Sequence, residues 1–182
     1  MPAWVVPMLA TKAGAAFSRV GWIFEPKWDG YRAMCFMREG TARFVSRNQR
    51  NLTHRFPELQ SIARSIKASS AIIDGEIVAV DEDGVQCFEQ LQNHRQDCFT
   101  IFFAFDLVFL NGESLTELPL VERKARLKQI LPRSQSERIR FTDSTCCGQR
   151  GLEMSTVWTN KLLSLISSRV ARNADNRSGG NA

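Results

Sequence analysis

The chain has 182 residues, of which 43% are hydrophobic and 24% charged, and its formal net charge at pH 7 is +5. This length accommodates one domain with a sizeable core, and the composition is that of an ordinary globular protein. No apolar run approaches the ~20 residues of a membrane span, and the five cysteines include no C-x-x-C pair. We therefore expect a cytoplasmic protein with no membrane segment, disulfide framework or zinc site.

The first half of the chain reads mainly as strands. Strands are predicted over 21–25 and 31–38, and Glu39-Gly40 predicts a hairpin turn into a return strand over 42–46. A polar, basic loop follows over 47–55. A helix is predicted from residue 57 to about 67, because apolar residues recur there at helical spacing.

The second half alternates strands with single helices. Strands are predicted over 71–80, 99–110 and 138–141, with turns at 81–84 and 111–112 and a short helix over 88–92. A helix is predicted over 120–131, with its apolar residues inward and its basic ones solvated. The inward residues are Leu127 and Ile130, and the solvated ones are Arg123, Lys124, Arg126 and Lys128.

The last 41 residues differ in character from the rest. Residues 142–150 are polar, residues 152–170 fit a helix, and residues 171–182 have the composition of a disordered segment. Residues 138–182 hold 7 Lys+Arg and 3 Asp+Glu, so they contribute +4 of the net charge. We expect an antiparallel-rich α+β domain over 1–141 and a divergent, partly disordered basic tail over 142–182.

The segment 25–32, with the sequence EPKWDGYR, joins two predicted strands and places Lys27 between carboxylates. A lysine nucleophile must lose its proton, which costs about 4–5 kcal/mol at pH 7 from an ordinary pKa of ~10.4. Nearby positive charge or a metal ion lowers that cost. Arg32 and Arg47 are candidate cations. Asp74 and Glu76 occupy alternate positions of one strand, so both carboxylates can meet a metal ion or a ribose hydroxyl.

Four ordered elements resemble those of the covalent nucleotidyltransferases, which comprise ATP-dependent DNA ligases, RNA ligases and capping enzymes. Segment 25–32 resembles the K-x-D-G-x-R signature, and Ser46-Arg47-Asn48 resembles the S-R-N-G element. Asp74-Gly75-Glu76 resembles the D-G-E element, and Phe105-Asp106-Leu107-Val108 resembles the element F-D-h-h. Trp28, Tyr31 and the segment from Phe56 to Leu59 most resemble the bacterial ligases of non-homologous end joining.

The resemblance implies a ligase-type nucleotidyltransferase fold, ATP-grasp-like, that uses ATP and Mg²⁺ (or Mn²⁺) on DNA with nicks or ends. Lys27 would be the nucleophile, and Glu25 and Phe105 would contact adenine. Arg32 and Arg47 would hold the ribose–phosphate region or the nick, and Glu76 would bind ribose or metal. End-joining proteins are implied partners, in the cytoplasm of a bacterium at its nucleoid.

The resemblance weakens near the C-terminus. Gly151-Leu152-Glu153 approaches the metal-binding E-G-h-h-h-K element, but Met154 and Trp158 stand where glycine and lysine are expected. No K-x-K element follows, and Gln49 replaces a glycine after Asn48. We therefore expect a C-terminally truncated domain, without an oligonucleotide-binding barrel, that is impaired in adenylation. Two alternatives stay open: an inactive nucleic-acid- or partner-binding remnant, and an RNA ligase or capping-type enzyme.

Overall fold

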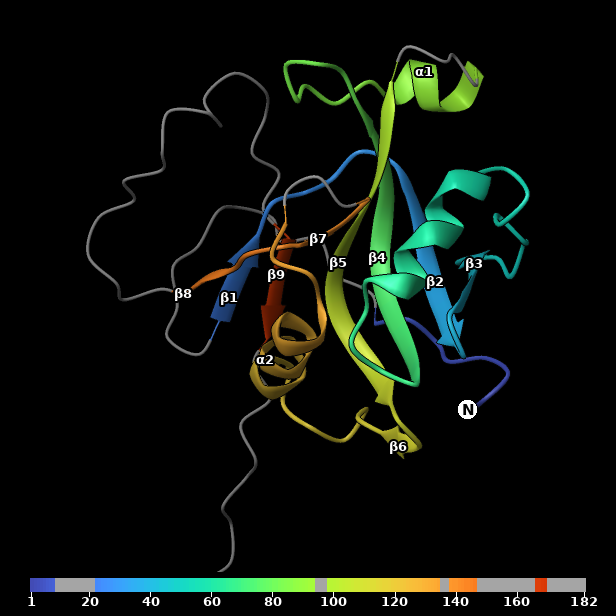
Figure 1. Ribbon diagram of the computed structural model, residues 1–182. Helices are drawn as coiled ribbons and strands as arrows, with labels where there is room; N and C mark the ends of the chain where they lie inside the picture. Colours follow the sequence, from blue (N-terminus) through green and yellow to red (C-terminus); the bar gives the residue numbers. More distant parts are fainter. Residues whose placement is uncertain (9–21, 94–97, 135–137, 147–165, 170–182) are drawn as a thin grey trace, which may run out of the picture.

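The computed structural model describes residues 1–8, 22–93, 98–134, 138–146 and 166–169. Figure 1 shows a large sheet beside a smaller one, with helices packed around them. The strands of the large sheet are β2 (Tyr31–Arg38), β3 (Thr41–Ser46), β4 (Ser70–Val80), β5 (Phe99–Leu110), β6 (Glu113–Ser114) and β7 (Ile139–Phe141). The small sheet contains β1 (Trp22–Glu25), β8 (Thr145–Cys146) and β9 (Ile166–Arg169). The helices are η1 (Pro57–Arg64), α1 (Phe88–Asn93) and α2 (Leu120–Ile130).

The large sheet has the order β3-β2-β4-β5-β6, and all of these neighbours are antiparallel. Only β7 is parallel to its partner, β5. The predicted antiparallel-rich α+β fold is therefore confirmed. The strand register shifts between Asp74 and Gly75, where β4 pairs with β5, so the sheet is irregular in the middle of its longest strand pair.

The two faces of the large sheet are covered differently. Alternate residues of β2 and β4, such as Cys35 and Ile73, enter the main apolar core together with side chains of η1 and α2. The opposite face carries two smaller apolar clusters, against which Trp4, Val5 and Trp28 pack. Arg32 of β2 and Asp74 and Glu76 of β4 alternate with the main-core residues of their strands, so they lie on this second face with the two smaller clusters.

The predicted helix after residue 56 is a 3₁₀-helix, which ends at Arg64 rather than near residue 67. Ser61 Oγ and Ser65 Oγ donate hydrogen bonds to the carbonyls of Glu58 and Ile62, three residues earlier. These side-chain bonds compete with the α-helical backbone pattern, and the backbone bond from Ser65 N to Ile62 O also spans three residues.

The prediction of a helix over 152–170 is wrong for Ile166–Arg169, the part of this segment that the structure describes. Ile166–Arg169 forms strand β9, which pairs antiparallel with β1, because β1 presents a free edge that a second strand satisfies. The remainder of that predicted helix and the disordered segment predicted over 171–182 lie outside the described residues. The expected boundary at residue 141 stays a prediction, although Thr142 is buried and its N–H donates to Ala104 O.

The described residues contain no helix that is long and apolar enough to cross a membrane.

The turn that follows β3 contains a strained residue. Gln49 has φ +59°, where a side chain costs about 1–2 kcal/mol, whereas glycine adopts this conformation freely. We expect Gln49→Gly to raise the free energy of unfolding by about 0.5–1 kcal/mol, as measured by urea denaturation. Asn48→Gly is the matched control, because Asn48 has no positive φ and should gain nothing. Equal gains in both variants would contradict the strain at Gln49.

Candidate active site

Lys27 lies exposed in the loop between β1 and β2, and among the described residues it makes no hydrogen bond or ion pair. The next two residues hold this loop. The Trp28 ring stacks on Phe103 with 3.7 Å between centroids, and its Nε1 donates to Thr142 Oγ1 at 3.1 Å. The backbone N–H of Asp29 donates to Gln86 Oε1 at 2.8 Å. The Lys27 side chain is thus exposed and has no polar partner among the described residues, although the loop that carries it is anchored on both Trp28 and Asp29.

Gly30 explains why the loop lies so close to β4. A Cβ added at this residue would lie 2.0 Å from the carbonyl oxygen of Ile77 and 3.2 Å from Glu76 Cγ. No side chain fits against the backbone at the shorter of these distances. The glycine of the predicted signature therefore brings the Lys27 loop into contact with Glu76.

Arg32 and Asp74 form a two-pronged ion pair across β2 and β4. Arg32 Nε and Nη2 donate to the two carboxylate oxygens of Asp74 at 3.1 and 2.7 Å, and Nη2 also donates to the carbonyl of Met8. Burial raises the pKa of Asp74 to about 6, although the bond from Arg32 opposes this rise. Burial lowers the pKa of Arg32, but the hydrogen bond and charge of Asp74, together with the charges of Glu76 and Asp106, outweigh it and leave that pKa raised.

Glu76 is the second carboxylate of this face, two residues after Asp74. Burial raises its pKa to about 7, Arg32 lowers it, and the charges of Asp74 and Asp29 raise it further. A hydrogen bond from the Gly30 backbone N–H lowers this pKa, and no Lys or Arg of the described residues forms an ion pair with the carboxylate. Among the described residues, Asp74 is therefore paired with Arg32, whereas Glu76 has no ion-pair partner.

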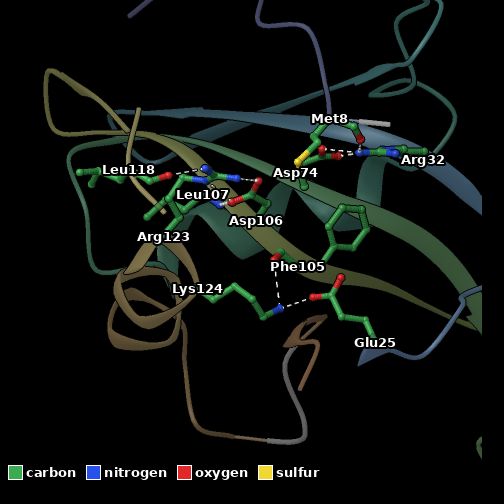
Figure 2. Close-up of polar contacts among 10 residues, drawn as sticks. All are labelled: Met8, Glu25, Arg32, Asp74, Phe105, Asp106, Leu107, Leu118, Arg123 and Lys124. Carbon is green, nitrogen blue, oxygen red and sulfur yellow. Dashed lines mark hydrogen bonds and ion pairs between the residues drawn. The ribbon is translucent and has the colours of Figure 1, made fainter. Parts of the chain in front are cut away.

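The Phe105 ring lies between two ion pairs, as Figure 2 shows. The Arg32 guanidinium is 5.3 Å from its centroid on one side, and Glu25 with Lys124 lies on the other. The ring is partly exposed, unlike most of its neighbours in β5. A flat, partly exposed aromatic surface beside charged groups suits stacking of a base.

Lys124 was predicted to lie on a solvated helix face, and this prediction is wrong. Its Nζ is buried and donates to Glu25 Oε1, to the carbonyl of Phe105 at 3.1 Å and to the carbonyl of Thr142 at 3.0 Å. Burial raises the pKa of Glu25, and Lys124 opposes that rise. Lys124 is thus a residue of the candidate site that the sequence did not identify.

Arg123 was also predicted to face solvent and is also buried. Its Nε and Nη2 donate to the two oxygens of Asp106, both at 2.8 Å, while Nη1 donates to the carbonyl of Leu118. The helix turns these two basic residues inward because buried carboxylates on β5 and β1 require cations. The signal was present in the sequence, since Asp106 interrupts an otherwise apolar strand.

Of the two remaining predicted site residues, the structure describes only Arg47, which is not part of this arrangement. Arg47 lies exposed in the turn after β3 and makes no hydrogen bond or ion pair with the described residues. Glu153 lies outside the described residues. No group of three or more possible metal-ligating side chains occurs in the described part of the chain. The roles of both residues stay predictions.

Residues 7–159 match the family model of the ATP dependent DNA ligase domain. Over 127 residues the chain is 36% identical to the multifunctional non-homologous end joining DNA repair protein LigD of Mycobacterium tuberculosis strain H37Rv, covering 69% of this chain and 17% of LigD. It is 33% identical over 144 residues to a DNA ligase of Pyrobaculum calidifontis, covering 70% of this chain and 25% of that ligase. The chain thus spans a quarter or less of the length of these relatives.

A solved structure of mycobacterial DNA ligase D complexed with ATP and MES superposes with a TM-score of 0.61 at 30% identity. The match covers 76% of this chain and 46% of that one. The sequence resemblance and the fold therefore agree, and the family match extends past the predicted boundary at residue 141. This chain belongs to the family of ATP-dependent DNA ligase domains.

Proposed function

We propose that this chain carries out the nucleotidyl-transfer step of an ATP-dependent DNA ligase, with Lys27 as the nucleophile. The observation that carries the proposal is the anchored loop: Lys27 is exposed, whereas Trp28 is stacked on β5 and Gly30 contacts Glu76. A nucleophile gains most when its surroundings hold it near the reacting atom. The partly exposed Phe105 ring and the Glu76 carboxylate, which has no ion-pair partner among the described residues, occupy the same face.

The proposed step forms one bond and breaks one. Lys27 Nζ attacks the α-phosphorus of ATP, a P–N bond forms, and the bond to the β-phosphate oxygen breaks, so that pyrophosphate leaves and the amine proton passes to solvent. Phe105 offers its ring to adenine, with Glu25 beside it, while Arg32 and Arg47 contribute positive charge toward the ribose and phosphates. Transfer of this kind depends on positioning and charge neutralisation.

The family implies a magnesium ion, and the described residues offer one carboxylate suited to contact it. Glu76 is the carboxylate suited to contact Mg²⁺ or Mn²⁺, because Asp74 is already neutralised by Arg32. Protein sites for Mg²⁺ commonly use one or two carboxylates together with substrate phosphates and waters. When bound, the metal neutralises charge on the phosphates; Glu153 is proposed as a further ligand from the sequence alone.

The AMP would then pass to the 5′-phosphate of a DNA nick or end, which a 3′-hydroxyl joins. The relatives that are named for end joining and DNA repair support DNA repair as the setting. End-joining proteins as partners and a bacterial cytoplasm as the location are further parts of the proposal, which rest on the family resemblance. We also propose that adenylation is slow in this chain, because Met154 and Trp158 replace the glycine and lysine of the element after Glu153.

Labelling with α-³²P-ATP and Mg²⁺ tests the proposal. We expect slow formation of a labelled protein that survives denaturation at alkaline pH and loses its label in acid, as a P–N bond does. Lys27→Arg should abolish the label, and Lys67→Arg, at an exposed lysine elsewhere, should leave it unchanged. Label from γ-³²P-ATP, or label that persists in Lys27→Arg, would contradict the assignment. Discharge of AMP onto nicked DNA, compared with nicked RNA, separates a DNA ligase from an RNA ligase.

A binding function without chemistry is the second candidate, and the +4 charge of residues 138–182 favours it. Neutralising DNA phosphates releases counterions, so such binding weakens steeply with salt. Salt-dependent binding to DNA by a chain that forms no adduct at Lys27 would support the binding function over the enzyme.

A further inference from the structure

Thr142, directly after β7, makes polar contacts with three separate parts of the site. Its N–H donates to the carbonyl of Ala104 at 2.8 Å, its Oγ1 accepts from Trp28 Nε1 at 3.1 Å, and its carbonyl accepts from Lys124 Nζ at 3.0 Å. The residue is 1% exposed. The bond to Ala104 therefore holds Thr142 against β5, and Thr142 in turn links β5 to the Lys27 loop and to helix α2.

Lys124 extends this set of contacts to the other side of Lys27. Its buried ammonium group binds Glu25, which is the last residue of β1 and lies two residues before Lys27. Trp28, one residue after Lys27, is held by the Thr142 hydroxyl. Both flanks of the lysine are thus tied, through one or two hydrogen bonds, to the same buried residue.

We propose that Thr142 is a positioning residue for Lys27, and that the Trp28–Thr142 hydrogen bond fixes the loop in the arrangement that adenylation requires. The proposal rests on the proposed function. Stacking on Phe103 is weakly directional, so it does not by itself fix the orientation of the indole over the phenyl ring. The Nε1–H donor fixes that orientation, since a hydrogen bond has a preferred direction and length.

Placement matters here because Lys27 has no polar contact of its own among the described residues. Its amine reaches the phosphorus only as accurately as its backbone is held. A misplacement of about 1 Å can lower the rate of a transfer step by up to about 100-fold. The alternative is a purely structural role, in which the Thr142 hydroxyl only accepts the hydrogen bond of a partly buried indole. The loss of this hydroxyl would then lower stability and leave the rate of adenylation unchanged.

Four variants of the full chain separate these cases. Trp28→Phe removes the donor and keeps an aromatic ring over Phe103, and Thr142→Val removes the acceptor while the backbone contacts of residue 142 remain. Thr142→Ser restores the acceptor, and the fourth variant combines the first two. Two measurements are made on each: the rate constant and ATP dependence of adduct formation at Lys27, and the amide hydrogen exchange of residues 27–30 compared with β3.

We expect Trp28→Phe and Thr142→Val each to lower the rate constant at saturating ATP roughly tenfold, with the ATP dependence unchanged. Exchange should quicken in the loop and stay unchanged in β3. The double variant should be no worse than either single one, because both remove the same bond, and Thr142→Ser should behave like the original chain.

Three results would overturn the proposal: effects that add in the double variant, a Thr142→Ser variant as slow as Thr142→Val, or loop exchange that does not change. If the original chain forms no adduct, the proposed function fails. The exchange measurement still decides in that case whether the Trp28–Thr142 bond holds the loop.

Discussion

Lys124→Met is expected to lower the free energy of unfolding by about 3–5 kcal/mol, the cost of removing one partner of a buried ion pair. The methionine fills similar space, but the carboxylate of Glu25 remains buried without its cation. The carbonyls of Phe105 and Thr142 lose a donor at the same time. Urea denaturation at pH 7 measures the change, as a shift of the midpoint with an unchanged slope.

Two further variants identify the cause of the loss. Lys128→Met is the matched control, because Lys128 is on the same helix and is exposed, with its Nζ 3.3 Å from the exposed Asp143 and 5.2 Å from the Phe141 ring centroid. It should change stability by less than about 0.5 kcal/mol. Glu25→Gln in the Lys124→Met background should recover part of the loss, because no charge is then left buried. A loss below about 1 kcal/mol in Lys124→Met would show that water reaches Glu25.

The Lys124–Glu25 ion pair also shows which kind of contact the sequence could not predict. Helical spacing put Leu127 and Ile130 inward correctly, but it assigned Lys124 and Arg123 to solvent because they are charged. Their partners, Glu25 and Asp106, are 99 and 17 residues away in the chain. Periodicity is a local property, so it cannot report a contact of that separation. The available signal was a carboxylate within or next to an apolar strand, which needs a cation.

The strands were easier to predict because their signals are local. Alternation, turn glycines and the apolar run of β5 each lie within about 12 residues, and hairpins join neighbouring segments. The pairing of β1 with Ile166–Arg169 instead joins segments that lie far apart in the sequence, and no single hairpin turn connects them. The resemblance points to Lys27, Arg32 and Glu76 as site residues, which stays a prediction, and it does not indicate which carboxylate Arg32 pairs with.

The second large expected effect concerns Glu76, the carboxylate that Arg32 does not pair with. Glu76→Gln is expected to raise the free energy of unfolding by about 2 kcal/mol at pH 8 and by less than about 1 kcal/mol at pH 5. The pKa of Glu76 is raised from 4.5 to about 7 in the folded chain, mainly by burial. Below pH 4.5 the carboxyl is protonated in both states and costs nothing. Between pH 4.5 and 7 the unfolded state loses its proton first, so the stability of the folded chain falls as pH rises.

Glutamine removes that penalty, and its benefit therefore grows through this pH window and is constant above about pH 7. Urea denaturation of the original chain and the variant at pH 5 and pH 8 measures it. Glu82→Gln, at an exposed acid of the turn after β4, should gain nothing at either pH. An equal gain from Glu76→Gln at both pH values would mean that packing, and not the charge, is responsible.

A stabilising substitution at a site residue also tests what the residue is for. A carboxylate that burial disfavours is kept only where its charge has a use, such as contact with a metal ion or ribose. Glu76→Gln should therefore weaken Mg²⁺-dependent binding of ATP while it raises stability. In the original chain that binding should strengthen from pH 6 to pH 8, because the carboxylate ionises over this interval. Isothermal titration calorimetry at both pH values measures both effects, and unchanged binding in the variant would exclude Glu76 from the ligand site.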